Sequence, residues 1–152
     1  MITIIEGPDG AGKTTLAKYI AFVTNSEIIH FGKPANEAEH IAQLSQYADI
    51  LANKDNIVLD RSWLSDLVYA KVMKDREFIT TKEQSDALLE LGNGKAIVIF
   101  CNADIETLWQ RCQDRGETYV TQFDKLLYIR AEYMGLMQTV SEHLPVLHYE
   151  FA

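Results

Sequence analysis

The feature that most constrains this chain is a glycine-rich loop close to its first residue. It fits the phosphate-binding pattern Gly-x-x-x-x-Gly-Lys-Ser/Thr. The loop consists of nine consecutive residues: Gly7, Pro8, Asp9, Gly10, Ala11, Gly12, Lys13, Thr14 and Thr15. Glycines let the backbone curl so that successive N–H groups point into one concavity, which suits an anion with several charges. Lys13 adds a mobile positive charge, and the Thr14 hydroxyl is placed to ligate Mg²⁺. The pattern therefore predicts a site for ATP and Mg²⁺.

The residues on either side favour this interpretation over a glycine-rich turn with an incidental lysine. Residues 2–6 form a short apolar, β-branched run, as a buried strand needs. After the loop, Leu16, Ile20 and Val23 follow one another at helical spacing. Strand, loop and helix thus come in the required order, and the helix N-terminus adds its dipole to the anion site.

Size and charge narrow the class of protein. A chain of 152 residues with 47% hydrophobic residues suits one domain with a single buried core. The formal charge of −8 argues against a broad nucleic-acid surface, although it allows a locally positive pocket for a small anion. No apolar run reaches transmembrane length, and no signal peptide is expected. We therefore expect a cytoplasmic protein whose partners are small nucleotides, without a membrane or nucleic acid as partner.

The cysteines and histidines do not indicate a disulfide or a metal site. Cys101 and Cys112 each lie among apolar neighbours, so we expect two buried free thiols, as in a reducing cytosol. The four histidines show no paired spacing typical of metal ligands, and no zinc is predicted. Exposed helix faces could pair two copies of the chain into a homodimer, although no coiled-coil heptad is present.

Hydrophobic periodicity predicts alternating strands and helices over the whole chain. Strands are expected over residues 2–6, 27–31, 57–60, 96–101 and 146–149. Helices are expected over residues 13–24, 36–52, 62–73, 81–91, 105–115 and 122–143. This alternation predicts an α/β fold of the P-loop NTPase type, with three layers (α/β/α) and a five-stranded parallel sheet in the order 2-3-1-4-5. The near-continuous apolar character of the second, third and fourth strands predicts burial on both faces.

Capping residues mark several of the helix ends. Ser62 and Asp104 are good N-caps, and Thr80 with Glu83 fits a capping box. Gly92 is expected to end the fourth helix in a left-handed turn. The last helix is expected to bury one apolar face in the core. That face comprises Phe123, Leu126, Leu127, Tyr133, Met134 and Met137.

Ligands of parallel sheets bind beyond the carboxyl ends of the strands, so those ends indicate the site. The third strand ends in Asp60-Arg61-Ser62. A carboxylate at this position is where P-loop enzymes hold Mg²⁺, usually through water, and the planar guanidinium of Arg61 suits a phosphate. A plain helix cap with a surface arginine would account for Ser62 but not for Asp60 and Arg61.

A second basic cluster follows the fourth strand. Arg111 and Arg115 are four residues apart and so share a helix face, while Gly116 breaks the helix before a polar loop. Two arginines beside a hinge could close over phosphates as a lid, over residues 111–121. The alternative is a solvated face on which either arginine pairs with Asp114.

A second substrate would lie opposite the nucleotide. Aromatic rings can stack on a base, and a carboxylate can hold a sugar hydroxyl. The polar and aromatic candidates are Asp9, His30, Phe31, Trp63, Asp66 and Tyr69. Phe31 and Trp63 are equally compatible with the core and with a pocket.

Three blocks of sequence resemble known kinases. Residues 5–16 resemble the opening of thymidylate kinases, a resemblance that implies that Asp9 faces the acceptor nucleotide. Residues 60–70 are similar to a segment that thymidylate and deoxynucleoside kinases share, in which the arginine, here Arg61, contacts the phosphates near the transfer point. Residues 108–117 resemble the lid of deoxynucleoside kinases, whose arginines grip the donor phosphates. Compact kinases of this kind resemble those encoded by bacteriophages.

The chain also departs from these families. It is shorter than typical members, and its lid holds fewer arginines. Thymidylate kinases usually carry Arg-Glu-Pro-Gly after the second strand, whereas this chain has His30-Phe31-Gly32-Lys33-Pro34. The acceptor-side arginine is therefore missing there, and Lys33 could replace it as a point charge.

The leading hypothesis is a nucleoside monophosphate kinase that uses ATP and Mg²⁺ to phosphorylate a deoxynucleotide such as dTMP. Lys13, Asp60, Arg61, Arg111 and Arg115 are its catalytic candidates. Thr14 and Asp60 are the expected metal ligands, and Asp9, Phe31, Lys33, Arg61, Trp63 and Tyr69 are the expected acceptor-binding residues.

Several alternatives stay open. A nucleoside kinase, or a kinase of a hydroxymethyl base in DNA, would need a general base, for which Glu6 or Asp60 could serve. A nucleotide-driven ATPase or switch is a rival from another class, although the guanine motif Asn-Lys-x-Asp is lacking. A module that only binds nucleotide is a third alternative.

Overall fold

The structure is a computed structural model, and it describes residues 1–150. Its five strands are β1 (Ile2–Glu6), β2 (Glu27–Ile29), β3 (Ile57–Asp60), β4 (Ala96–Asn102) and β5 (Val146–Glu150). They form one parallel sheet in the order β2-β3-β1-β4-β5, which confirms the predicted topology. Ile5 of β1 pairs with Asp60 of β3, so the glycine-rich loop that follows β1 begins beside the end of β3.

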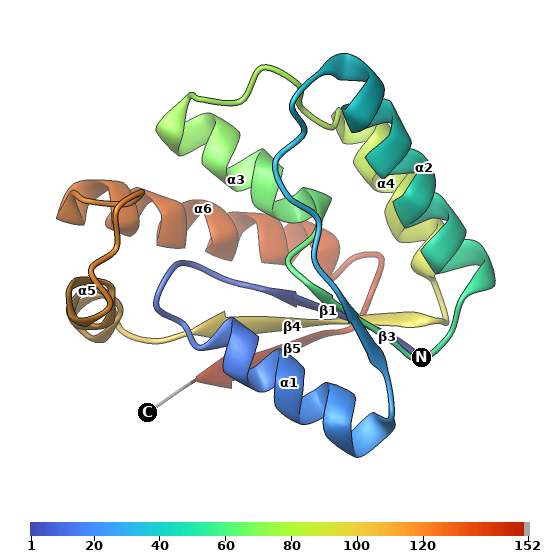
Figure 1. The fold of residues 1–152 in the computed structure, drawn as a ribbon, viewed down its shortest axis with the longest axis horizontal. Helices are drawn as coiled ribbons and strands as arrows, with labels where there is room; N and C mark the ends of the chain where they lie inside the picture. The colour runs from blue at the N-terminus through green and yellow to red at the C-terminus, as the bar shows by residue number, and fades with distance from the viewer. Residues whose placement is uncertain (151–152) are drawn as a thin grey trace.

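Six helices connect the strands. They are α1 (Lys13–Thr24), α2 (Glu37–Asn53), α3 (Trp63–Met73), α4 (Lys82–Gly92), α5 (Ile105–Asp114) and α6 (Phe123–Val140). In Figure 1, α1 covers one face of the sheet, and α2, α3, α4 and α6 lie over the other, giving the three predicted layers. Helix α5, seen end-on, lies beyond the carboxyl ends of the strands. In the described part of the chain, no helix combines the length and the apolar character that crossing a bilayer requires.

The central strands form the most deeply buried part of the core. All five residues of β1 and the first three of β3 are buried, whereas the side chains of β4 alternate between buried and half-buried. The second strand was expected to extend to Phe31 and to be buried on both faces, but β2 ends at Ile29 and Ile28 is 39% exposed. β2 is an edge strand with a neighbouring strand on one side only. Its apolar residues therefore stay partly exposed, although their apolar character predicted burial.

In two helices the buried residues differ in part from the apolar residues singled out in the sequence, although Leu16 and Ile20 of α1 do pack against the core. In α1, Val23 is 56% exposed, and the buried positions are Lys13, Ala17 and Ala21. In α6, Phe123, Leu127 and Met134 are each about 40% or more exposed. The predicted residues Leu126, Tyr133 and Met137 are buried, and Ile129 and Val140 complete the buried face of α6. Small side chains on α1 permit close approach to the sheet, which a search for large apolar residues overlooks.

The predicted caps are partly confirmed. The side chain of Ser62 accepts a hydrogen bond from the Leu64 amide, and that of Asp104 accepts one from Thr107. The capping box of α4 is formed by Thr81 and Gln84, one residue later than predicted, because Thr80 is itself buried. Gly92 is the last helical residue rather than a left-handed cap, and Gly94 takes the positive φ of 78° instead. Cys101 and Cys112 are both buried free thiols, as expected.

Gly7 supports the loop through its lack of a side chain. A Cβ built on it would lie 2.1 Å from the Cys101 carbonyl oxygen, at a φ of 151°. The clash with a carbonyl oxygen and the positive φ both involve the backbone, which cannot easily shift to relieve them. Gly7→Ala is therefore expected to lower the free energy of unfolding by at least ~3 kcal/mol. Urea unfolding of the two proteins measures this. Gly94→Ala is the matched control, since its φ is also positive but nothing lies within 4 Å, and it should cost only about 1 kcal/mol. Equal effects at the two positions would contradict the steric argument.

Candidate functional site

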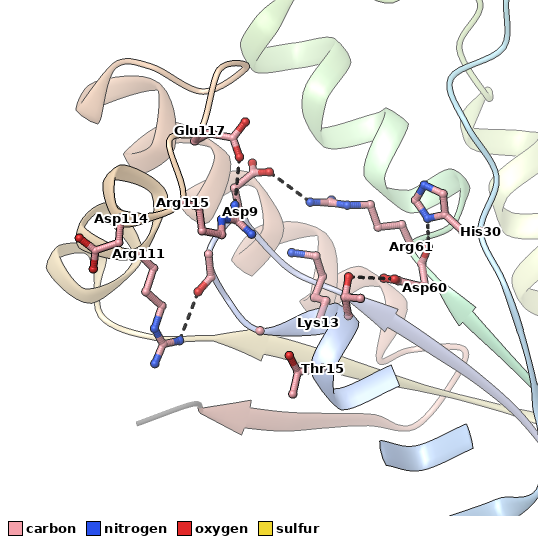
Figure 2. A pocket seen from close by; sticks show the side chains of 13 residues that line it. Asp9, Lys13, Thr15, His30, Asp60, Arg61, Arg111, Asp114, Arg115 and Glu117 are labelled. Carbon is pink, nitrogen blue, oxygen red and sulfur yellow. Dashed lines mark hydrogen bonds and ion pairs between the residues drawn. The ribbon is translucent and has the colours of Figure 1, made fainter. Parts of the chain in front are cut away.

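The glycine-rich loop borders a cavity of about 510 Å³ at the carboxyl ends of the strands. We call it the loop cavity. Figure 2 shows its side chains converging from the loop, from the end of β3 and from the segment around α5. Its lining residues are Asp9, Gly10, Gly12, Lys13, Thr14, Thr15, His30, Asp60, Arg61, Arg111, Asp114, Arg115 and Glu117. Gly7, Pro8 and Ala11 of the loop are not among them. The four cationic candidates for catalysis, Lys13, Arg61, Arg111 and Arg115, therefore lie at one cavity.

The loop backbone has the curled conformation that its glycines predict. Gly10 and Gly12 have φ values of 83° and 78°, and Gly12 directly precedes α1. The Lys13 ammonium is buried and donates a hydrogen bond of 2.6 Å to the Pro8 carbonyl. Burial, reinforced by the nearby positive charge of Arg61, lowers the pKa of Lys13 to about 7. A polyphosphate entering the cavity would stabilise the charged form of this lysine.

Thr14 and Asp60 lie side by side although 46 residues separate them. The Thr14 hydroxyl donates a hydrogen bond of 3.1 Å to an Asp60 carboxylate oxygen. On the other side of Asp60, its carbonyl is 2.8 Å from Nδ1 of His30. A hydroxyl and a carboxylate are the oxygen ligands that Mg²⁺ prefers, and Mg²⁺ is usually held by only one or two carboxylates plus phosphates and water. This pair therefore fits the ion.

Arg61 occupies a strained position between β3 and α3. Its φ is 68°, a left-handed conformation that costs a non-glycine residue roughly 1–2 kcal/mol. Its guanidinium pairs with Asp9 at 3.3 Å and donates to Ser65 and Tyr133 at 3.2 and 3.3 Å. Backbone strain of this kind concentrates at functional sites. The turn directs the guanidinium across the end of the sheet instead of along the strand.

A second, smaller cavity of about 230 Å³ lies on the other side of Arg61. We call it the aromatic cavity. It is lined by Asp9, His30, Phe31, Gly32, Lys33, Gln43, Tyr47, Arg61, Ser62, Ser65, Asp66, Tyr69, Arg76 and Tyr119. Phe31 and Tyr47 pack with their ring centroids 4.6 Å apart, and the Tyr69 hydroxyl donates to Asp9 at 2.6 Å. The predicted residues Asp9, Phe31, Lys33, Arg61 and Tyr69 thus come together here.

Two predicted site residues lie elsewhere. Trp63 is 1% exposed and lines neither cavity, because it packs behind Tyr47 and donates its indole N–H to Ser85 at 3.0 Å. Glu6 is fully buried, and its carboxylate accepts hydrogen bonds from the Ser62 backbone and hydroxyl and from the hydroxyls of Ser65 and Tyr133. Burial raises the pKa of Glu6, against the opposing effect of Arg61. Glu6 therefore orders the region beneath Arg61 and does not face a ligand.

Sequence reasoning missed an arginine on the aromatic cavity. Arg76, between α3 and α4, donates to Asp66 at 3.3 Å and to Asp75 at 2.7 Å. The expected substitute, Lys33, does line the cavity, but its ammonium donates to the Asp75 carbonyl at 2.8 Å. Arg76 sits in a polar stretch that reads as an ordinary loop, so only the charged character of residues 74–77 could have drawn attention to it.

Arg111 and Arg115, the arginines of the predicted lid, both line the loop cavity. Arg111 donates to the Gly10 carbonyl at 3.2 Å, which ties α5 to the glycine-rich loop. Arg115 pairs with Glu117 at 3.0 Å, rather than with Asp114. Asp114 accepts a hydrogen bond from the Gln110 side chain at 2.9 Å.

No family model matches the chain. The SPbeta prophage-derived protein YorR of Bacillus subtilis (strain 168) is 31% identical over 141 residues, which cover 88% of this chain and 82% of YorR. The chain belongs to the YorR family. The prophage origin of that relative agrees with the resemblance to phage-encoded kinases.

Solved structures extend the comparison. YorR from Bacillus subtilis, crystallised in complex with phosphorylated GDP, has a TM-score of 0.84 and 26% identity, with 99% of this chain and 85% of YorR covered. Deoxyadenosine kinase from M. mycoides, with bound products, has a TM-score of 0.66 and 19% identity over 98% of this chain and 89% of the kinase. Shikimate kinase from Acinetobacter baumannii follows at 0.58 and 15%, covering 99% and 83%. The chain thus shares the P-loop kinase fold with YorR and with these two enzymes.

Proposed function

We propose that this YorR-family protein transfers the γ-phosphoryl group of ATP to a deoxynucleoside monophosphate, in the manner of thymidylate kinases. The observation that carries the proposal is the position of Arg61, which lines both the loop cavity and the aromatic cavity. A guanidinium at this junction can contact the donor phosphates and an acceptor phosphate together.

The donor side follows from the loop cavity. The loop amides and Lys13 hold the β- and γ-phosphates of ATP, and Arg111 and Arg115 add positive charge from residues 111–121, which act as the lid. Thr14 and Asp60 hold Mg²⁺, which supplies charge neutralisation at the phosphates when it is bound. Positioning and charge stabilisation are sufficient here, because a phosphate acceptor is already ionised and needs no general base.

The carboxylates of the aromatic cavity support a phosphate acceptor over a hydroxyl acceptor. Among the described residues that line it, the carboxylates are Asp9 and Asp66, and each is paired with an arginine, Arg61 or Arg76. Glu6, the earlier candidate for a base, is enclosed by its own hydrogen bonds. Because the oxygens of Asp9 and Asp66 already accept hydrogen bonds from these arginines, and in Asp9 also from Tyr69, they are less free to take the proton of a substrate hydroxyl. A nucleoside is therefore the less suitable substrate.

The rest of the aromatic cavity suits a nucleobase. Phe31, Tyr47 and Tyr69 offer ring faces, and Gln43, Asp66 and Arg76 offer polar groups for the edge of a base. The Gln43 amide nitrogen is committed to the Gly32 carbonyl at 2.8 Å. Because the relative YorR was crystallised with phosphorylated GDP, guanine nucleotides belong beside thymidine nucleotides among the acceptors to be tested.

A panel of acceptors tests the proposal. The protein is incubated with γ-labelled ATP, Mg²⁺ and, in separate reactions, the four deoxynucleosides, their monophosphates and hydroxymethylated DNA. We expect label on at least one deoxynucleoside monophosphate and at least ~100-fold less on every nucleoside, because Glu6 is enclosed and the proposal assigns Asp60 to Mg²⁺ rather than to a substrate hydroxyl. Label on a nucleoside or on DNA alone would contradict the assignment. Fast ATP hydrolysis that ignores every acceptor would instead favour the ATPase or switch.

A further inference from the structure

Tyr119 belongs to the lid but lines the cavity on the other side of the site. It lies in the connection between α5 and α6, two residues after Glu117, and is 38% exposed. Glu117 lines the loop cavity, whereas Tyr119 lines the aromatic cavity. One short loop therefore contacts both proposed substrate sites.

The Tyr119 side chain is fixed to the acceptor side by several contacts. Its hydroxyl donates to Asp75 at 2.8 Å and accepts from Arg76 at 2.9 Å. Its ring lies 5.9 Å from that of Tyr69, and the Arg76 guanidinium lies 5.8 Å from the centre of each ring. Arg76 in turn holds Asp66. Tyr119 thus completes the wall of the aromatic cavity beside the polar groups that face a base.

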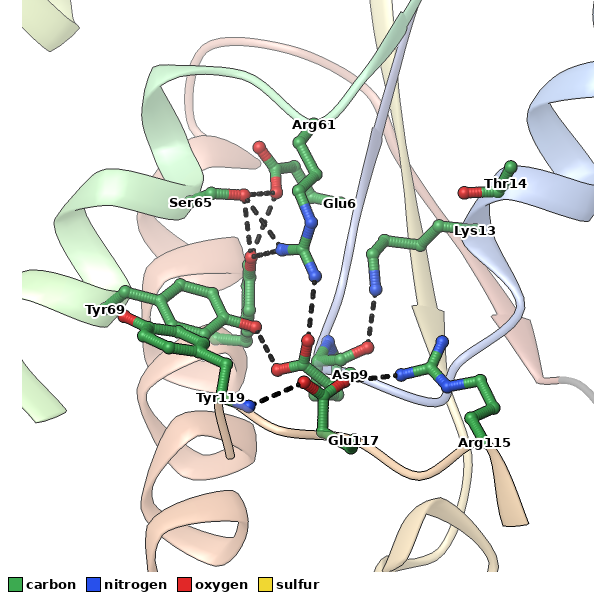
Figure 3. A network of polar contacts seen from close by, with 12 residues as sticks. Glu6, Asp9, Lys13, Thr14, Arg61, Ser65, Tyr69, Arg115, Glu117 and Tyr119 are labelled. Carbon is green, nitrogen blue, oxygen red and sulfur yellow. Dashed lines mark hydrogen bonds and ion pairs between the residues drawn. The ribbon is translucent and has the colours of Figure 1, made fainter. Parts of the chain in front are cut away.

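A single carboxylate connects this wall to the donor side. One oxygen of Glu117 accepts from Arg115 at 3.0 Å, and the other accepts from the Tyr119 backbone N–H at 3.0 Å (Figure 3). Gly116, with a φ of 65°, precedes Glu117, and Val120, which is 1% exposed, anchors the loop after Tyr119. Movement of Arg115 toward donor phosphates would therefore shift the position of Tyr119.

We propose that Tyr119 is an acceptor-binding residue carried by the donor lid, so that ATP and the acceptor each raise the affinity of the protein for the other. This inference rests on the proposed function and adds a coupling between its two substrates. Both substrates favour the arrangement of the loop in which Glu117 links Arg115 to Tyr119, so whichever binds first stabilises that arrangement and the second binds more tightly. Thermodynamic linkage requires the two enhancements to be equal.

Calorimetry measures the coupling directly. A non-hydrolysable ATP analogue with Mg²⁺ is titrated into the protein with and without a saturating deoxynucleoside monophosphate, chosen as the one most strongly labelled in the acceptor panel. We expect the monophosphate to tighten analogue binding about tenfold in the wild type. In Tyr119→Phe, which keeps the ring but loses the bonds to Asp75 and Arg76, the enhancement should fall to about threefold or less.

Further variants isolate the contribution of this side chain. In Tyr119→Ala the enhancement should disappear, and the KM for the acceptor should rise at least fivefold with little change in kcat at saturation. Tyr128→Phe, an exposed tyrosine on α6, is the matched control and should keep the full enhancement. Circular dichroism spectra establish that each variant is folded.

The outcomes separate this inference from the proposed function. If the analogue and the monophosphate bind but neither affects the other, or if Tyr119→Ala keeps the enhancement, the coupling is refuted while phosphoryl transfer stands. If the wild type binds neither nucleotide, both proposals fall.

Discussion

Replacing Lys13 with alanine is expected to lower the turnover of the protein at least ~100-fold, which corresponds to about 2.7 kcal/mol of lost transition-state stabilisation. The ammonium lies in the loop cavity beside Thr14, and its hydrogen bond to the Pro8 carbonyl keeps it at the phosphate cradle. Steady-state transfer to the best acceptor of the panel measures the effect. Thermal unfolding should remain close to that of the wild type, because the fold gains little from a charged group that burial already disfavours.

Lys18→Ala provides the matched control for that experiment. Lys18 is on the same helix but exposed to solvent, so its loss should leave turnover nearly unchanged. Normal turnover in Lys13→Ala would show that the glycine-rich loop takes no part in the reaction. A fall of similar size in both variants would point to a general charge effect instead.

Arg61 is expected to be as important as Lys13. Arg61→Ala should reduce turnover at least ~100-fold, because Arg61 is, among the described residues, the only arginine that lines both cavities. Arg61→Lys should recover little of this. An ammonium is a point charge and cannot bond Asp9, Tyr133 and a phosphate in the same arrangement. The acceptor KM and kcat are measured together, since an arginine at the transfer point should affect kcat most strongly.

The control for this pair of variants is Arg130→Lys. Arg130, on α6, donates to Asn102 and to the Ala103 carbonyl, away from both cavities. Its replacement should change turnover by less than about twofold. Wild-type kcat in Arg61→Lys would show that a single positive charge is sufficient and that the fork geometry does not matter.

Local patterns predicted the elements and their order. The glycine-rich loop, the strand before it and the aspartate that ends β3 belong to short stretches whose conformation depends on neighbouring residues, so the loop conformation and the sheet order were correctly predicted. Parallel α/β topology then brings the strand ends to one edge. The convergence of Lys13, Asp60 and Arg61 follows from that rule, and their catalytic roles stay predictions.

Predictions that depended on which side a residue faces were less successful. Trp63 follows Arg61 closely and has the character of a pocket residue, yet the rotation of α3 buries it behind Tyr47. Glu6 ends a strand at the correct edge, but it points into the layer beneath Arg61. The spacing of apolar residues predicts a helix, but it does not predict which side of that helix packs against the rest of the molecule.

The sequence by itself determined that a phosphate loop would close the first strand and that its partners would come from the ends of parallel strands. Only the tertiary structure decided which groups complete the second cavity. Arg76 and Tyr119 are 43 residues apart, in loops without a motif, and they meet because α3 and the loop between α5 and α6 return to the same edge of the sheet. Contacts between distant loops depend on the packing of whole helices, and that information is not contained in any short stretch of residues.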